Sequence, residues 1–579
     1  MSYLHTVKTM LKSRLNKPKG NAMNHQTQLT RRTFLQTSAA TAGSLAIGSQ
    51  QAFSQEQPNV ILIITDDQGY GDIGVHGNKK IKTPNMDRFA NESVAFDRFY
   101  VCPVCAPTRA CLMTGRYNYR TGVVDTYLGR AMMHNDEITM AEVFKNSGYA
   151  TGIFGKWHLG DNYPLRPSEQ GFDEVLVHKG GGIGQPSDPP GNSYDNPILF
   201  HNNKPFHYKG YCTDIFTDAT IEFIKKNREK PFFAYLSTNA PHTPLEIDKR
   251  YVQPYLDMGL DETTAKVYGM VENIDENLGR LMHNLNQYGL DENTIVIFMT
   301  DNGPQQKRYT ANLRGRKGSV YEGGIRVPCF IRWPKKLKAG KEVKPIAAHI
   351  DMLPTLIAAC GLKQPENKLD GINLMPVLEG QTATTPDRTL FTQWHRGDEP
   401  EKFRACAAWD QRYKLINGKE LYDIQNDPYE KHDIADQNPD IVERLRQDYL
   451  DWFRDVSGTR GYAPPRIYIG TKHENPVILT RQDWRGPHAS WGKKGLGYWE
   501  VDIRQTASYN LTLRIHAAGE GDTAHVKCGD THKTQKLQKG ATHCVFPDIP
   551  LQQGEGRLEA WIDTGKEKIG VRYLDVLMI

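Results

Sequence analysis

Residues 102–116, which read CPVCAPTRACLMTGR, combine side chains that could bind and attack an anion. Within this segment Cys105 is followed by Pro107 and Arg109. Proline favours the first position of a helix, so a helix beginning at Pro107 would put Cys105 at or just before its N-terminus. Backbone N–H groups and the positive end of the helix dipole would face a ligand there, and Arg109 would add a forked cation. An isolated Cys-x-Pro is more often a buried structural cysteine, so other segments must decide.

Two apolar runs end in oxygen-bearing side chains. Residues 59–64 and 294–299 are rich in β-branched residues, which is typical of a strand buried on both faces. If the two strands are parallel neighbours, their C-terminal ends converge on one crevice. The residues that follow the two strands would then supply three carboxylates and one amide oxygen, which suit Ca²⁺ or Mg²⁺ and not zinc. The residues after either strand alone could be solvated turn residues that cap a helix. The predicted cation ligands are Asp66, Asp67, Asp301 and Asn302.

Further cationic and imidazole side chains follow other predicted elements. The apolar runs 148–154 and 231–237 lead into GKWHLG and APHTP, and a basic run occupies 314–326. A lone loop histidine is usually only hydrogen-bonded, and a basic run is usually a solvated face. Here both histidines follow strands on the edge predicted to carry the acids. The candidates are Lys156, His158, His242 and Lys317.

Taken together, these segments resemble the type I sulfatases. The matching motifs are C-x-P-x-R with its TGR tail, GKWHLG, PHTP and K-G-x-x-x-E-G-G-x-R-V-P, in the family's order over residues 59–452. The resemblance implies an alkaline-phosphatase-like α/β fold, in which a large, mostly parallel sheet lies between helices and a small α+β subdomain follows. It also implies that a formylglycine-generating maturation enzyme oxidises Cys105 to formylglycine, whose hydrated aldehyde is the nucleophile.

The resemblance assigns roles to the site residues. His242 is the candidate proton donor to the leaving oxygen, with Lys317 as sulfate ligand or co-donor. Arg109 and Lys156 hold the hydrate and the sulfate, and His158 takes a proton so that sulfate is expelled. A divalent cation, Ca²⁺ or else Mg²⁺, neutralises sulfate oxygens. Its implied ligands are Asp66, Asp67, Cys105, Asp301 and Asn302.

The predicted substrate is a sulfated polysaccharide or oligosaccharide. Residues 393–396 and the Gly-rich loop 180–191 are candidate sugar contacts. Two alternatives remain open at this stage: a phosphonate or phosphodiester hydrolase that uses the same aldehyde, and an inactive carbohydrate-binding relative. The intact Cys105, Arg109 and cation ligands argue against the inactive relative.

The N-terminal residues predict export. Arg31 and Arg32 begin a string that looks like a twin-arginine signal, and the apolar stretch after it is too short for a membrane anchor. This leader predicts a bacterial protein of the periplasm or the medium. Residues 1–54 hold seven Lys and Arg residues and no acid, so without them the formal charge of +5 becomes −2. Nothing in that balance favours a nucleic-acid partner.

Residues beyond the sulfatase-like segments predict an accessory module. Alternating strands such as 509–515 and 568–573 suggest a β-sandwich, with Cys528 and Cys544 as its most plausible disulfide. The module could bind carbohydrate or pack against the catalytic domain, and packing is favoured because no aromatic platform is identifiable. The predicted divisions are leader 1–54, catalytic domain 55–388, small subdomain 389–456, linker 457–476 and β-rich module 477–579.

Overall fold

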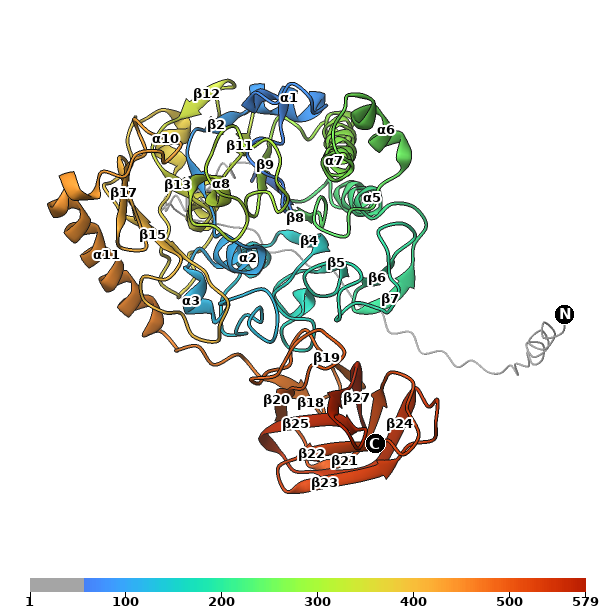
Figure 1. Cartoon of the computed structure of the whole chain (residues 1–579). Helices are drawn as coiled ribbons and strands as arrows, with labels where there is room; N and C mark the ends of the chain where they lie inside the picture. Colours follow the sequence, from blue (N-terminus) through green and yellow to red (C-terminus); the bar gives the residue numbers. More distant parts are fainter. Residues whose placement is uncertain (1–56) are drawn as a thin grey trace, which may run out of the picture. The chain divides into compact units, whose positions relative to one another are not determined.

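The computed structural model describes residues 57–579, so the predicted leader and its twin-arginine signal lie outside the described residues. A ten-stranded sheet forms the centre of the catalytic region (Figure 1). Its strands, in spatial order, are β12 (Lys341–Val343), β2 (Val94–Phe96), β11 (Cys329–Arg332), β9 (Thr294–Thr300), β1 (Asn59–Thr65), β8 (Phe232–Ser237), β4 (Ala150–Lys156), β5 (Glu174–His178), β6 (Ile198–His201) and β7 (Lys204–His207).

The central strands of this sheet are parallel, as the sequence predicts. Strand β1 pairs with β9 on one side and with β8 on the other, and β8 pairs with β4. Thr65 lies opposite Thr300, so the polar residues that follow the two strands begin at the same level. The outer part is mixed, because β11, β6 and β7 run antiparallel to their neighbours. A short sheet of β10 (Arg326–Val327), β3 (Phe99–Tyr100) and β13 (Ala347–Ala348) adjoins it.

Helices cover both faces of the sheet, which explains why β1 is apolar from Val60 to Ile64. Val60, Leu62 and Ile64 pack with residues of α2, α4, α9 and α10, whereas Ile61 and Ile63 pack with α1, α5, α6 and α7. The bounds are α1 (Pro84–Asn91), α2 (Cys105–Thr114), α3 (Asn118–Thr121), α4 (Met140–Asn146), α5 (Cys212–Lys226), α6 (Lys249–Asp257), α7 (Glu262–Gln287), α8 (Glu322–Ile325), α9 (Met352–Cys360) and α10 (Met375–Glu379).

Helix α2 begins two residues before the predicted start. Cys105 is its first residue, and Val104 at the N-cap has extended backbone angles. The helix ends at Gly115, whose φ of 66° is the left-handed conformation that glycine adopts without steric cost. The expectation that Cys105 stands at a helix N-terminus is confirmed.

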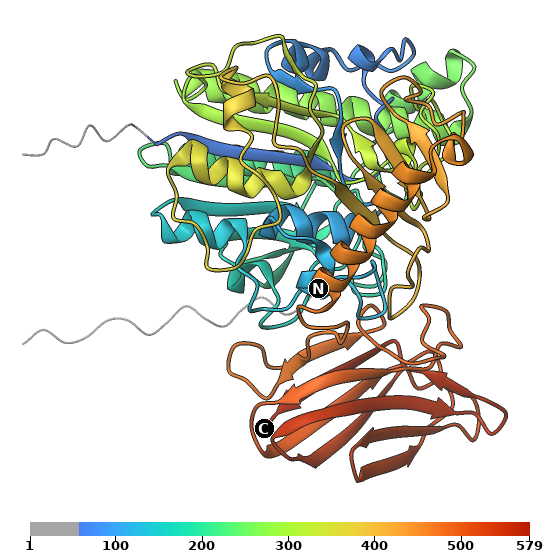
Figure 2. The same cartoon turned by 90° about the vertical axis from the view of Figure 1, so that its left-hand side faces the viewer.

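A four-stranded antiparallel sheet forms the small subdomain. It contains β14 (Leu390–Gln393), β15 (Cys406–Trp409), β16 (Tyr413–Ile416) and β17 (Glu420–Asp423). Helix α11 (Pro439–Ser457) lies along these strands (orange in Figure 2). Lys414 on β16 is fully buried, and its Nζ lies 2.9 Å from carboxylates of Glu322 and Glu430, so an ion-pair network joins this sheet to α8.

The C-terminal module consists of two sheets around one core. The first contains β18 (Ile467–Ile469), β20 (Tyr498–Ile503), β25 (Gly554–Asp563), β22 (Thr523–Cys528) and β23 (Thr531–Lys536), with β26 (Lys568–Gly570) beside β25. The second contains β19 (Val477–Thr480), β27 (Tyr573–Met578), β21 (Ala507–Arg514) and β24 (His543–Leu551).

Three details of the module differ from the prediction. The predicted linker contains β18, which pairs with β20 inside the module. The run 568–573 is not one strand, because it divides between β26 and β27 in different sheets. The proposed Cys528–Cys544 disulfide is wrong: the two cysteines lie on strands of opposite sheets, and both are free. Within residues 57–579, no helix has both the length and the apolar character needed to cross a bilayer.

Candidate active site

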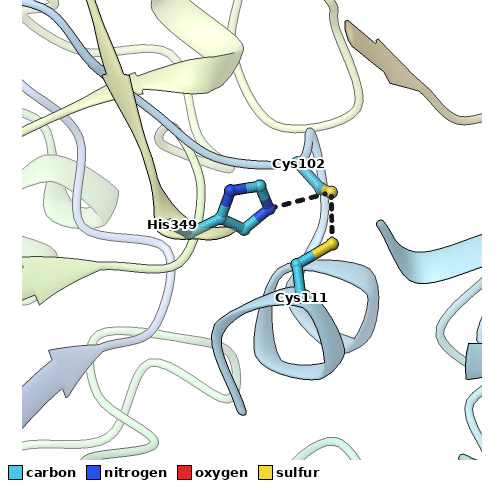
Figure 3. A group of neighbouring side chains, drawn as sticks. All are labelled: Cys102, Cys111 and His349. Atoms are coloured by element: carbon cyan, nitrogen blue, oxygen red, sulfur yellow. Dashed lines mark hydrogen bonds between the residues drawn. The ribbon is translucent and has the colours of Figure 1, made fainter. Parts of the chain in front are cut away.

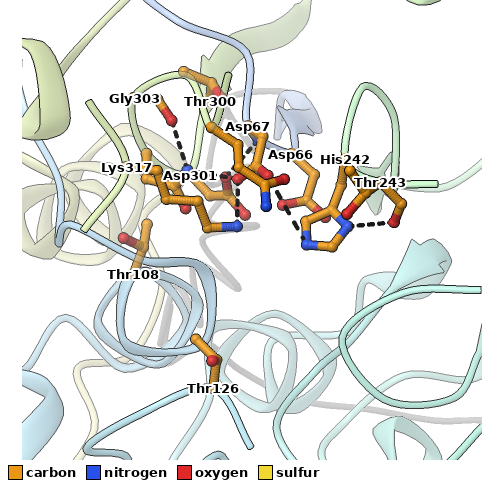
Figure 4. Close-up of polar contacts among 12 residues, drawn as sticks. Asp66, Asp67, Thr108, Thr126, His242, Thr243, Thr300, Asp301, Gly303 and Lys317 are labelled. Atoms are coloured by element: carbon orange, nitrogen blue, oxygen red, sulfur yellow. Dashed lines mark hydrogen bonds and ion pairs between the residues drawn. The ribbon is translucent and has the colours of Figure 1, made fainter. Parts of the chain in front are cut away.

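The polar ends of β1 and β9 meet at one point, as the sequence predicts (Figure 4). The backbone N–H of Asp67 donates to Oδ1 of Asp301 over 3.2 Å, and Nδ2 of Asn302 donates to Oδ1 of Asp67 over 2.8 Å. Asp66 lies beside them, and all four side chains are fully buried. Parallel pairing of β1 with β9 therefore places three carboxylates and an amide together.

Each carboxylate has a basic partner. Nζ of Lys156 lies 2.6 Å from Asp66, and Nζ of Lys317 lies 2.6 Å from Asp67. The Nε and Nη2 of Arg109 donate to Oδ2 of Asp301 over 3.1 and 2.8 Å. Three positive charges thus offset three negative charges in a largely buried region, where an unpaired charge would cost several kcal/mol.

Three buried oxygen atoms of this cluster nevertheless lack a hydrogen-bond partner. They are Oδ1 of Asp66, Oδ2 of Asp67 and Oδ1 of Asn302. Ligand atoms of Asp66, Cys105 and Asp301 lie within 4.8 Å of one another. Buried oxygens without donors are rare because each loses its hydrogen bonds to water. A cradle of free carboxylate and amide oxygens fits a hard divalent cation, as predicted from the sequence.

Cys105 faces this cradle from the first turn of α2. Its side chain is buried, and burial raises the pKa of its thiol despite the opposing effect of Lys156 and Lys317. The thiol is therefore protonated near neutral pH. An unmodified Cys105 would be a weak nucleophile, because the thiolate is the reactive form.

The two predicted histidines are held in defined tautomers. Nδ1 of His242 lies 2.6 Å from the carbonyl oxygen of Thr243, so it must donate, and Nε2 is left to face the site. Nε2 of His158 lies 2.8 Å from the carbonyl oxygen of Thr126, which leaves Nδ1 as a lone pair without a partner. A carbonyl accepts only, so each contact assigns the proton to one nitrogen.

A cavity of about 460 Å³ opens above Cys105. Its floor includes Cys105, His158, His242 and Lys317. Arg109 and Lys156 do not line it, since both side chains are fully buried behind the carboxylates. The structure thus brings all the predicted residues together but gives Arg109 and Lys156 supporting positions.

The rim of this cavity contains both predicted sugar-contact segments. Trp394 and Arg396 line it from one side, and Gly181 and Gln185 of the Gly-rich loop line it from another. His395 of the same segment turns away, because its ring contacts the backbone of Arg396 and Glu401.

Sequence reasoning missed several residues that form the rim or support it from behind. Asp125 is buried and accepts hydrogen bonds from Nε1 of Trp394 over 3.0 Å and from Arg396 over 2.7 Å. Arg396 also stacks on the ring of Tyr127, 4.4 Å from its centroid. Trp491, from the C-terminal module, completes the rim. None of these residues belongs to a recognisable motif, and only their contacts reveal them.

A second group of cysteines lies at helix α2 (Figure 3), and none of its residues lines the cavity. Sγ of Cys102 is 3.8 Å from Sγ of Cys111 and 3.3 Å from Nε2 of His349. All three side chains are buried. Burial opposes ionisation of Cys102, but the hydrogen bond from Cys111 and the charge of His349 lower the pKa of its thiol to about 5.

The parallel sheet, the cation cradle at its strand ends and the helix N-terminus facing it define an alkaline-phosphatase-like hydrolase. A profile of the family described as Sulfatase matches residues 58–362. The profile described as N-sulphoglucosamine sulphohydrolase, C-terminal, matches residues 316–452. The chain therefore belongs to the sulfatase family and is a sulfatase.

Individual relatives agree with this assignment. N-acetylgalactosamine-6-sulfatase of Mus musculus is 31% identical over 384 residues, which cover 61% of this chain and 71% of the relative. Arylsulfatase A of Homo sapiens is 30% identical over 464 residues, covering 67% and 86% respectively. Among solved structures, Ps i-CgsB in complex with k-i-k-neocarrahexaose has a TM-score of 0.64 and 30% identity, and the match covers 70% of this chain and 95% of that one.

Proposed function

We propose that this sulfatase removes sulfate from a sulfated carbohydrate with Cys105 in its formylglycine form. The observation that carries the proposal is the position of Cys105, at a helix N-terminus that faces both the open cavity and the unpaired oxygens of Asp66, Asp67 and Asn302. The cavity rim of Trp394, Arg396 and Tyr127 offers ring faces and a cation, which suit a sulfated sugar.

The relatives support the same substrate class. One is an N-acetylgalactosamine-6-sulfatase, and one solved structure holds a neocarrahexaose. Formylglycine would require a maturation enzyme as a partner, and its hydrate would supply the oxygen nucleophile that a protonated thiol cannot. The leader outside the described residues fits export to the periplasm or the medium, where such glycans occur.

The cation ligands in this proposal are Asp66, Asp67, Asp301, Asn302 and residue 105. A bound Ca²⁺ or Mg²⁺ would supply positive charge to the sulfate oxygens. Arg109 positions this cradle: its guanidinium holds Asp301 and also donates to the backbone oxygen of Lys156 over 3.3 Å and to Ser237. Lys156 and Lys317 hold Asp66 and Asp67 in place.

In this proposal, one residue accepts a proton from the group at position 105, and other residues donate a proton to the leaving oxygen. Nδ1 of His158 is a buried lone pair at the cavity floor, so it can accept a proton from the group at position 105. Lys317 and His242 line the cavity and can protonate the departing sugar oxygen. Lys317 is already an ammonium, whereas Nε2 of His242 must first gain a proton.

Leaving-group dependence separates these two donors. A sugar alkoxide needs a proton much more than a nitrophenolate does, so the variant that lacks the donor should lose more rate on a sulfated sugar than on 4-nitrophenyl sulfate. We propose measuring kcat for His242→Gln and Lys317→Met on both substrates. Equal losses on both substrates in both variants would remove the donor assignment while leaving the sulfatase activity intact.

Two measurements test the proposed function itself. The mass of the tryptic peptide that contains Cys105, from protein of the native host, should show an aldehyde in place of the thiol. A panel of sulfated glycans, with a paired aryl sulfate and aryl phosphodiester, should show turnover on sulfate esters. An unmodified Cys105 in active protein, or faster turnover of the phosphodiester, would contradict the proposal.

A further inference from the structure

A second cavity, of about 300 Å³, adjoins the active-site cavity. The two cavities share Gln185 and Trp491 in their linings. One wall of the second cavity comes from the Gly-rich loop and the other from the C-terminal module. The module residues are Arg481, Trp491, Lys493, His516, Arg572 and Tyr573.

The module is held against the catalytic region by specific contacts. The hydroxyl of Tyr573 donates to the backbone oxygen of Asp188 over 3.2 Å. Gln482 donates to the backbone oxygen of Thr126 over 3.0 Å and accepts from the backbone N–H of Gly129 over 2.9 Å. Leu128 also packs into the core of the module. These contacts give Trp491 a defined place beside the active site.

The second cavity has an excess of positive charge. In residues 57–579, no ion pair joins Arg481, Lys493 or Arg572 to a carboxylate. The single acidic residue in its lining, Asp188, already accepts hydrogen bonds from the backbone N–H of Gly184 and from Asn192. Burial also raises the pKa of Asp188 to about 7, so at neutral pH its carboxyl group carries only part of a negative charge.

The three basic side chains have different tasks. Arg481 is buried and donates to backbone oxygens of Gly570, Val571, Trp491 and Gly492, so it holds the Trp491 loop in place. Lys493 and Arg572 are exposed and free to reach a ligand. Burial lowers the pKa of His516, and the nearby positive charges of Arg572, Arg481 and Lys493 lower it further.

Trp491 connects the two cavities. Its ring packs edge-on against Tyr127, with 5.3 Å between centroids, and its indole N–H has no partner. A half-buried indole between a catalytic pocket and a cationic pocket suits a sugar ring that continues past the reacting unit.

We infer that the module and the Gly-rich loop together form a subsite for a second anionic sugar unit, adjacent to the unit whose sulfate is removed. The occupant is a saccharide carrying its own sulfate or carboxylate, held by Lys493 and Arg572 and stacked on Trp491. This inference rests on the proposed function, since it assumes a sulfated oligosaccharide substrate. It also assigns the accessory module a part in substrate binding beyond packing.

The test compares a short and a long substrate. We propose kinetics of the double variant Lys493→Gln/Arg572→Gln on 4-nitrophenyl sulfate and on a neocarrahexaose that carries several sulfates. The expected result is a KM about tenfold higher for the hexasaccharide, with kcat unchanged and with no change on the aryl sulfate, because two charge-assisted hydrogen bonds are lost outside the reacting centre. Trp491→Ala removes a side chain that lines both cavities, so it should raise KM for the hexasaccharide by a larger factor than KM for the aryl sulfate.

Lys494→Gln is the matched control. Lys494 neighbours Lys493 but lies outside the cavity lining and pairs with Glu567 over 2.8 Å, so its loss should leave both substrates unaffected. An equal loss on both substrates, or no loss on either, would overturn the subsite. Wild-type protein that cleaves the aryl sulfate but no sulfated glycan would instead refute the proposed function, and this is established before the variants are measured.

Discussion

Two cysteine sites lie close together around helix α2, and they differ in what surrounds the sulfur. Cys105 faces carboxylates, lysines and an open cavity, whereas Cys102 is sealed among Cys111, His349 and apolar side chains. The pKa of the Cys105 thiol is raised, while that of Cys102 is lowered to about 5. A search for a reactive thiolate would therefore select Cys102, the cysteine that no substrate can reach.

In the proposed function, access to the cavity and the surrounding charges, and not thiol acidity, distinguish Cys105 from Cys102. The groups around Cys105 are carboxylate and amide oxygens and lysine ammonium groups. They suit a divalent ion and a sulfate, but they do not activate a thiol. The proposed formylglycine would place an oxygen nucleophile at position 105, and an oxygen nucleophile fits these surroundings better than a protonated thiol does. The cluster at Cys102 instead resembles a buried polar network that stabilises the loop before α2.

The largest expected effect is the loss of turnover when Cys105 is replaced, compared with a replacement in the other cysteine site. Cys105→Ala should lower turnover of a sulfate ester by about 10⁴-fold or more, because the nucleophile is lost, while the free energy of unfolding changes by only about 1 kcal/mol. Cys111→Ala is the matched variant on the same helix and should keep turnover per folded molecule. Turnover by Cys105→Ala that equals the wild type would refute the assignment of position 105.

Removal of the cation should affect only the Cys105 side. Treatment with EDTA should abolish activity and lower the melting temperature, because unpaired oxygens of Asp66, Asp67 and Asn302 lose their charge partner. Added Ca²⁺ or Mg²⁺ should restore both properties, and Zn²⁺ should not. Cys102→Ser protein should respond as the wild type does. Full activity after exhaustive chelation would remove the cation from the proposal.

Disruption of the buried cluster of Cys102, Cys111 and His349 should lower the free energy of unfolding. Cys111→Ala removes a fully buried side chain and the hydrogen bond to Cys102, so the free energy of unfolding should fall by about 2 kcal/mol. Urea unfolding of Cys111→Ala and Cys105→Ala measures the difference. If Cys105→Ala is the less stable of the two, the contrast between the two sites is wrong.

The stability that Cys102 contributes should also depend on pH. The pKa of Cys102 is about 5 in the folded protein against an ordinary value of 9.0, so the native state binds fewer protons than the unfolded state between these values. Its stabilisation is complete above pH 9 and is lost as the pH falls towards 5. Cys102→Ser should therefore cost more at pH 8 than at pH 5.5, and Cys105→Ser should show no such trend over this range.

Much of the fold and of the candidate site could be predicted because its determinants are local. Both faces of β1 pack against apolar cores, so the strand requires a continuous apolar run. Such a run is visible in residues 59–64. The N-terminus of helix α7 is also set locally, because the carboxylate of Asp261 at its N-cap accepts a hydrogen bond from the backbone N–H of Thr264. The positions of Asp66 and Asp301 then follow from parallel pairing.

Other features depended on contacts between distant segments and could not be predicted. Arg109 was expected to touch the sulfate, but Asp301 and Ser237 bind its guanidinium behind the cavity. Run 568–573 appeared to be one strand, because strand propensity does not show where a chain crosses from one sheet to another.

The sequence by itself determined which chemistry is available: a cysteine at a helix start, carboxylate and amide oxygens after apolar strands, and histidines and lysines on the same edge. These follow from patterns a few residues long, which bias backbone conformation directly. Only the tertiary structure decided which side chains face the substrate, that Trp491 and the basic residues of the module extend the cavity, and that Cys102 is sealed. Such outcomes depend on how loops far apart in the chain pack, and short-range patterns carry no record of that.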